Sequence, residues 1–130
     1  MFGRGPRSVR PWYVLGLPDP ATMRPLAPDV ACFVTNRISA EGAAVGYMVR
    51  MPVEPGDRKG NSGWQFMAGD EDQAYIDDPD NSHIFSVNTI ANHDPAVIPF
   101  LDRARGTAWG RKGNTFVEEP LPWSEDEGPA

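Results

Sequence analysis

The sequence predicts a single α+β domain: an antiparallel sheet of about five or six short strands with two or three short helices. Three observations lead to this class. The chain has 130 residues, a length that fits one domain with one hydrophobic core. Its 14 prolines and 13 glycines interrupt the chain often, so regular elements should be short. Its apolar runs have the length of strands, and turn residues separate them.

The first two strands are predicted on either side of a polar turn. Residues 30–35, VACFVT, form a continuous apolar run rich in β-branched and aromatic side chains, which favours a buried strand over a helix. Residues 36–42 are polar and predict a turn, and residues 43–51 alternate as a second strand. An antiparallel hairpin is the simplest pairing of these two strands. Residues 52–63 have the composition of a loop.

A third strand and a short helix follow. Residues 64–68, WQFMA, predict a strand with Trp64 and Phe66 on one face. Asp70 is suited to cap a short helix, and Pro79 cannot extend that helix.

The next part of the chain carries two helix-start signals. Residues 83–87, HIFSV, predict a fourth short strand or the lead into a helix. Ser86 is suited to cap a helix over residues 87–92. Asp94, followed by a proline, predicts a second helix over residues 95–103.

A closing hairpin is predicted to complete the domain. Residues 106–111 and 115–119 flank a KGN turn, which favours two antiparallel strands. We therefore expect the α+β domain to span residues 30–119.

The two ends of the chain differ from this domain in composition. Residues 1–29 hold many prolines and predict an extended or poorly ordered arm. Trp12, Tyr13 and Leu17 would order this arm if they pack on the core. Residues 120–130 are acidic and proline-rich, which is typical of a disordered tail.

Charge and cysteine content limit the possible functions. The net charge of −6 and the pI near 4.8 argue against a nucleic-acid binder and favour a basic protein as partner. The alternative is that the acidic residues only keep a small domain soluble. No apolar run reaches membrane length, so we expect no membrane association and a cytoplasmic protein. Cys32 is the only cysteine, which excludes an internal disulfide, and its apolar setting predicts a buried side chain rather than a nucleophile.

Carboxylates are most concentrated between residues 70 and 80, where no lysine or arginine lies among them. Such a concentration is costly unless the side chains stay solvated or meet cations. The carboxylates are those of Asp70, Glu71, Asp72, Asp77, Asp78 and Asp80.

A metal site is the first enzymatic reading of this acidic segment. An EF-hand loop needs glycine at its sixth position, but counting from Asp80 puts Phe85 there. His83 and His93 have no HExxH pattern and no cysteine cluster beside them. We therefore expect no metal, no cofactor and no catalytic residues. The enzymatic alternative is a metal-assisted hydrolase that uses the carboxylates of residues 70–80.

Binding is the better use of the same residues, because carboxylates steer a basic partner and rigid aromatic side chains anchor it. In the alternative interpretation the aromatic residues are core and the acidic residues form a solvated face. The predicted partner-binding residues are Trp64, Asp70, Glu71, Asp72, Asp77, Asp78, Asp80 and Asn81.

A family resemblance is carried by short segments in a fixed order: ACFVTNRI at 31–38, GYMVR at 46–50, SGW at 62–64, AGDED at 68–72, DPDN at 78–81 and VNTIANHDPAVIPFLD at 87–102. In these segments the chain closely resembles immunity protein family thirty-three, small bacterial proteins of polymorphic toxin systems that were formerly a domain of unknown function. The resemblance covers about residues 30–118.

This resemblance implies a protein that neutralises a cognate toxin by binding it, often by covering the toxin's active site. The family provides no established active-site residues to carry over. Our hypothesis is that the acidic segment mimics phosphates to a basic nuclease domain. The alternative among binding modules is a housekeeping protein-interaction domain without a toxin partner.

Overall fold

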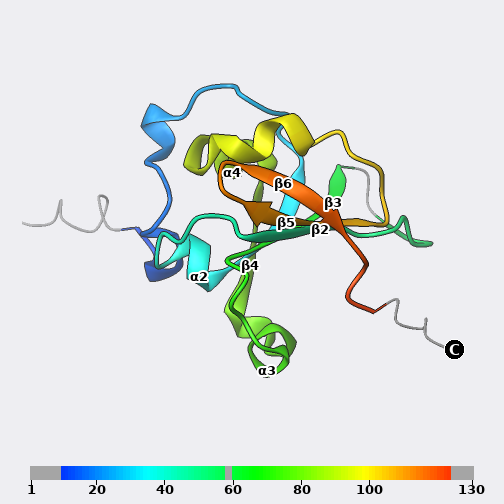
Figure 1. Ribbon diagram of the computed structural model, residues 1–130. Helices are drawn as coiled ribbons and strands as arrows, with labels where there is room; N and C mark the ends of the chain where they lie inside the picture. The colour runs from blue at the N-terminus through cyan, green and yellow to red at the C-terminus, as the bar shows by residue number, and fades with distance from the viewer. Residues whose placement is uncertain (1–9, 58–59, 124–130) are drawn as a thin grey trace, which may run out of the picture.

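The computed structural model describes residues 10–57 and 60–123. Within them lies one six-stranded sheet with the strand order β4-β1-β3-β2-β5-β6 (Figure 1). The strands are β1 Ala31–Thr35, β2 Tyr47–Arg50, β3 Asn61–Met67, β4 Ser82–Ser86, β5 Thr107–Lys112 and β6 Thr115–Glu119. The α+β class is therefore confirmed.

Short helical segments connect the strands. Two of them, α4 and η4, lie over one face of the sheet, whereas α3 projects from the opposite side (Figure 1). The α-helices are α2 Asn36–Ser39, α3 Gln73–Asp77 and α4 Val87–His93. The 3-10 segments are η1 Trp12–Val14, η2 Pro20–Thr22, η3 Pro79–Asn81 and η4 Pro95–Phe100.

The prediction of a purely antiparallel sheet is wrong, because β1 and β3 run parallel. The predicted hairpin between the first two strands is also wrong: β3 is inserted between them, and β2 pairs with β3 and β5. The connection from β1 to β2 contains α2 instead of the predicted polar turn. Ile38 of α2 is fully buried, so the chain crosses over the sheet instead of reversing tightly. This leaves room for β3 between β1 and β2, with neighbouring strands about 4.8 Å apart.

The third strand begins earlier than predicted, at Asn61 instead of Trp64. Ser62 stabilises this extension, because its hydroxyl donates a 2.6 Å hydrogen bond to the carbonyl of Ala31. Gly63 has a φ of 84°, and the pairing register shifts beside it, between Ala31 and Phe33. A composition that resembles a loop therefore forms a bulged strand start.

The first predicted helix starts two residues later than expected. The helix α3 is capped by Asp72, whose carboxylate accepts from the backbone N–H of Tyr75, and not by Asp70. The other start signals are confirmed: Ser86 caps α4, and Asp94 caps η4. The second predicted helix ends at Phe100 instead of residue 103 and is a 3-10 segment, because in an α-helix the Pro99 ring would clash with the carbonyl of Pro95.

The closing hairpin forms as predicted. β5 and β6 pair from Lys112 and Thr115 at the turn to Ala108 and Glu119. Gly113 has a φ of 63°, the left-handed conformation that this tight turn requires.

The core lies between the sheet and the layer of α4 and η4. Val34, Met48 and Phe66 point into it from the sheet, and Ile90 and Val97 meet them from the helices. Each of these side chains is 0% exposed. Cys32 lies in the same core, and burial raises the pKa of its thiol to about 12, as expected for a structural cysteine.

A largely buried ion pair between Arg111 and Asp94 joins the helical layer to the sheet. One carboxylate oxygen of Asp94 accepts from the backbone N–H of Val45 at 2.9 Å and from the Arg111 guanidinium at 2.6 Å. The other oxygen accepts from the backbone N–H of Ala96 at 3.3 Å. One side chain therefore joins η4 to the chain before β2 and to β5.

The segment before β1 packs on this domain over its described part. Leu17 is 6% exposed and belongs to the core. The Arg10 guanidinium donates to the carbonyls of Val14, Leu17 and Pro18. Residues 1–9 of the predicted arm and residues 124–130 of the predicted tail lie outside the described residues.

Candidate functional site

The acidic segment, residues 70–81, forms a projecting corner of the molecule through α3 and η3 (Figure 1). Five carboxylate side chains of this segment are exposed. They belong to Asp70, Asp72, Asp77, Asp78 and Asp80.

Glu71 differs from the other acidic residues because its carboxylate points inward. It accepts hydrogen bonds from the hydroxyl of Thr35 at 2.6 Å and from the backbone N–H groups of Ala68 and Gly69, both at 2.8 Å. Burial alone would raise the pKa of Glu71. The hydrogen bonds outweigh burial and lower the pKa below its ordinary value. Glu71 thus joins the end of β3 to β1 as an anion.

Several of the exposed carboxylates also hold the corner in shape. Asp72 caps α3, and Asp78 caps η3 by accepting from the backbone N–H of Asp80 at 2.9 Å. Asp70 lies 3.5 Å from the Arg37 guanidinium. Asn81 donates its side-chain amide to the carbonyl of Tyr75 at 3.1 Å. The corner is therefore an ordered array of negative charge.

Trp64 was predicted to bind a partner at the surface, but it lies in the core. The residue is 1% exposed, and its indole N–H donates to the carbonyl of Leu101 at 3.2 Å. The Arg50 guanidinium lies 5.6 Å from the ring centroid. Trp64 thus supports the sheet under the helical layer, and a partner does not reach its ring in this conformation.

Within the described residues, no group of three or more His, Cys, Asp or Glu side chains is arranged to hold a metal ion. Both histidines have structural contacts. His83 shares a 2.9 Å hydrogen bond with Asn36 and stacks on the Tyr13 ring at 3.9 Å. His93 contacts the carbonyl of Ala43 at 2.8 Å.

The sheet face opposite α4 has a feature that the sequence analysis missed. Phe33 of β1 and Ile84 of β4 lie side by side on this face and are 44% and 64% exposed. The apolar run 30–35 predicts a buried strand, yet Phe33 is exposed between Cys32 and Val34, which face the core. In the sequence all three of these side chains are apolar, so no alternation of apolar and polar residues marks Phe33 as exposed.

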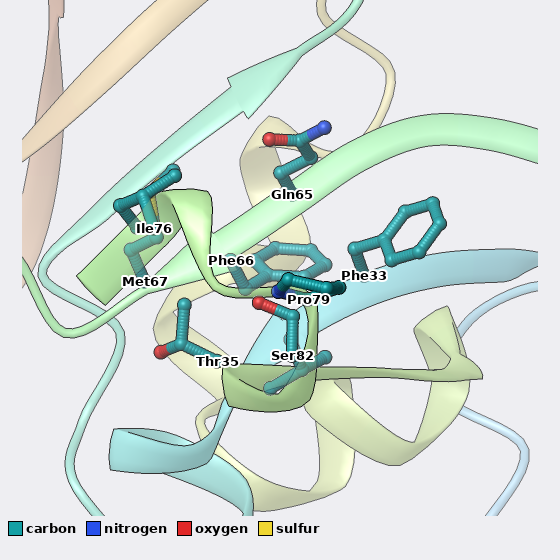
Figure 2. A pocket seen from close by; sticks show the side chains of 9 residues that line it. Phe33, Thr35, Gln65, Phe66, Met67, Ile76, Pro79 and Ser82 are labelled. Atoms are coloured by element: carbon teal, nitrogen blue, oxygen red, sulfur yellow. The ribbon is translucent and has the colours of Figure 1, made fainter. Parts of the chain in front are cut away.

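A shallow hollow lies beside Phe33 on this face, between the sheet and α3. It has a volume of about 270 Å³, and Gln65, Met67, Ile76 and Pro79 line it (Figure 2). Ser82 and Thr35 close its lower side in Figure 2. We call the surface formed by Phe33, Gln65, Met67, Ile76, Pro79 and Ile84 the open patch.

The rest of this face is better covered. Val49 of β2 lies in the middle of the sheet and is only 2% exposed. A second hollow, of about 500 Å³, includes Val49, Ile76 and Asp72 and is bordered by Trp123 from the segment after β6. Trp123 therefore borders the hollow beside β2, whereas Phe33 and Ile84 of the open patch are exposed over β1 and β4.

A family model described as Immunity protein Imm33 domain matches residues 32–119. This match covers more than half of the chain and runs from β1 to the end of β6. The chain belongs to this family. Imm33 proteins are immunity proteins, whose general role is to neutralise a toxin, and such proteins are generally not enzymes. The acidic segment and the open patch both lie within the matched residues of this Imm33 domain.

No curated protein and no solved structure matches this Imm33 chain. Over the described residues, the chain has no helix of the length and apolarity that crossing a membrane requires.

Proposed function

We propose that this protein binds one cognate bacterial toxin in the cytoplasm and neutralises it by masking the toxin's active or substrate-binding surface. The protein itself performs no catalysis in this proposal. The observation that carries it is the family match across the whole sheet, from residue 32 to residue 119.

The exposed carboxylates of the acidic segment support a basic toxin domain as the partner. Opposite charges raise the rate of association and fix the orientation of the partner. Caps and hydrogen bonds hold Asp72 and Asp78 in place, so the negative charges keep a defined spacing. A nuclease domain that binds phosphates presents the complementary basic surface. The same charge repels nucleic acid and anionic lipid, so neither is a partner in this proposal.

Growth rescue tests this proposal. Where a toxin-like protein is encoded beside this gene, that protein is expressed in a bacterial host, alone or together with this protein. We expect arrest without the protein and growth with it, and inhibition of the purified toxin at a near-equimolar ratio. An unrelated acidic domain of similar net charge is the control. A toxin that stays fully active at saturating amounts of this protein would contradict the proposal, and would favour a housekeeping interaction domain.

A further inference from the structure

We propose that the open patch is the binding centre for the partner, and that the partner inserts an apolar protrusion flanked by lysine or arginine. This inference rests on the proposed function, because it names the surface that the toxin would occupy. The acidic segment then steers the partner, and the open patch holds it.

The first argument is exposure of large apolar groups at one place. Phe33 and Ile84 are paired across β1 and β4, so their side chains form one continuous surface. Gln65 is the parallel neighbour of Phe33 on β3 and carries this surface to the hollow under α3. An apolar cluster beside a hollow, bordered by polar groups, is the usual composition of a binding centre.

The second argument is the charge around the open patch. On one side α3 and η3 bring the acidic segment against it: Pro79 lines the hollow, and Asp78 and Asp80 flank Pro79. On the other side Glu54 and Asp57 share a depression with Phe33. Arg105 also lines that depression, so this second border is mixed in sign. A partner's basic residues therefore fit the α3 side best.

The third argument concerns two other groups that could cover the open patch, a second copy of this chain and residues 124–130. Two copies of this chain joined through the open patch by a twofold axis would bring acidic borders close together. The seven residues after Trp123, SEDEGPA, contain no large apolar side chain with which to cover Phe33 or Ile84. A basic partner with an apolar protrusion satisfies both the apolar centre and its acidic border.

Binding to an inactive form of the toxin tests the patch with two substitutions. Ile84→Arg places a positive charge where the partner is basic, and Phe33→Ala removes apolar contact without adding charge. We expect each to weaken the Kd by about tenfold or more, mainly through faster dissociation. Leu15→Arg is the matched control, because Leu15 is 60% exposed and lies in the segment before β1. It should change the Kd less than about twofold.

A probe independent of the toxin separates this inference from the proposed function. An amphipathic peptide of lysine and leucine is titrated into the isotope-labelled protein, with a glutamate and leucine peptide as the control. We expect the lysine peptide to shift the amide resonances of Phe33, Gln65 and Ile84, and the Ile84→Arg variant to lose these shifts.

The outcomes of the two tests are distinct. Shifts confined to α4 or to residues 10–29, or no shifts at all, would overturn the open patch as the binding centre even where growth rescue succeeds. Concentration-dependent dimerisation that Ile84→Arg abolishes would make a second copy the occupant and would also overturn it. Failed growth rescue together with peptide binding at the patch would reject the toxin and retain the surface.

Discussion

Glu71 accepts hydrogen bonds from one hydroxyl and two backbone N–H groups, so its role differs from that of its acidic neighbours. Its carboxylate closes the turn after β3 and ties that turn to Thr35 at the end of β1. Residue type and position in an acidic run do not reveal this role. The signal is local: Glu71 lies two residues after Gly69, which has a φ of 104° just beyond the end of β3, where backbone N–H groups need an acceptor.

We predict that Glu71→Gln lowers the free energy of unfolding by about 1–2 kcal/mol at neutral pH, because a neutral amide accepts these hydrogen bonds less strongly. Since the folded-state pKa of Glu71 is lowered, its contribution is complete above the unfolded value near 4.5 and is lost as the pH falls through the folded-state pKa. Urea unfolding of both proteins across acidic and neutral pH measures this. The difference should shrink toward low pH, and Asp77→Asn, an exposed control, should show no such trend.

At the scale of secondary structure, the helices and strands that depend on neighbouring residues could be predicted from the sequence. Ser86 and Asp94 predict helix starts, because the side chain of a cap accepts from backbone N–H groups only a few residues away. The β5–β6 hairpin forms around its own turn for the same reason. The insertion of β3 between β1 and β2 depends on a partner that is distant in the chain, and no local pattern encodes it. The apolar run of β1 is equally compatible with one buried face or two, so the exposure of Phe33 also escaped prediction.

The corner formed by α3 and η3 should control how fast a partner arrives. We predict that the double variant Asp77→Asn, Asp80→Asn slows association several-fold and flattens its dependence on salt, with dissociation nearly unchanged. Neither substitution removes the carboxylate that caps α3 or η3. Stopped-flow kinetics with the inactive toxin, at two ionic strengths, measure this.

The matched control for that variant is Asp29→Asn, Glu118→Gln. It removes the same charge from exposed positions outside the acidic segment. Equal slowing by both double variants would show that the net charge, and not the corner, steers the partner.

The geometry of the same corner also distinguishes between two functions, a binding protein and a metal-assisted hydrolase. Asp72 and Asp78 are engaged as caps and Glu71 as a turn acceptor, so they do not converge on one point. We predict that millimolar Ca²⁺, Mg²⁺ or Mn²⁺ leaves the Tm unchanged, because an ion that binds the folded state would raise it. Differential scanning fluorimetry, with an equal ionic strength of NaCl as the reference, measures this. A saturable rise in Tm with one ion, lost in Asp72→Asn, would support the hydrolase.

At the scale of the whole molecule, the domain extends beyond the residues that the family model matches. The match begins at residue 32, yet the described segment before it contributes to the core. Asn88 and Asn92 of α4 hold its backbone, since their side-chain oxygens accept from the N–H groups of Arg24, Leu26 and Ala27. Proline content predicts an arm and leaves open whether Leu17 packs on the core, because composition reports the lack of regular ladders and not the contacts of single side chains.

Leu17 and Leu15 provide a matched pair for measuring this contribution. Leu17 is 6% exposed in the core, whereas Leu15, two residues earlier, is 60% exposed. We predict that Leu17→Ala lowers the free energy of unfolding by about 2–3 kcal/mol, through lost apolar burial and the cavity left behind. Leu15→Ala should change it by less than about 0.5 kcal/mol. Urea denaturation of the full chain measures both. Equal, small effects would mean that the segment before β1 only rests on the domain, and that the stability resides in residues 30–119.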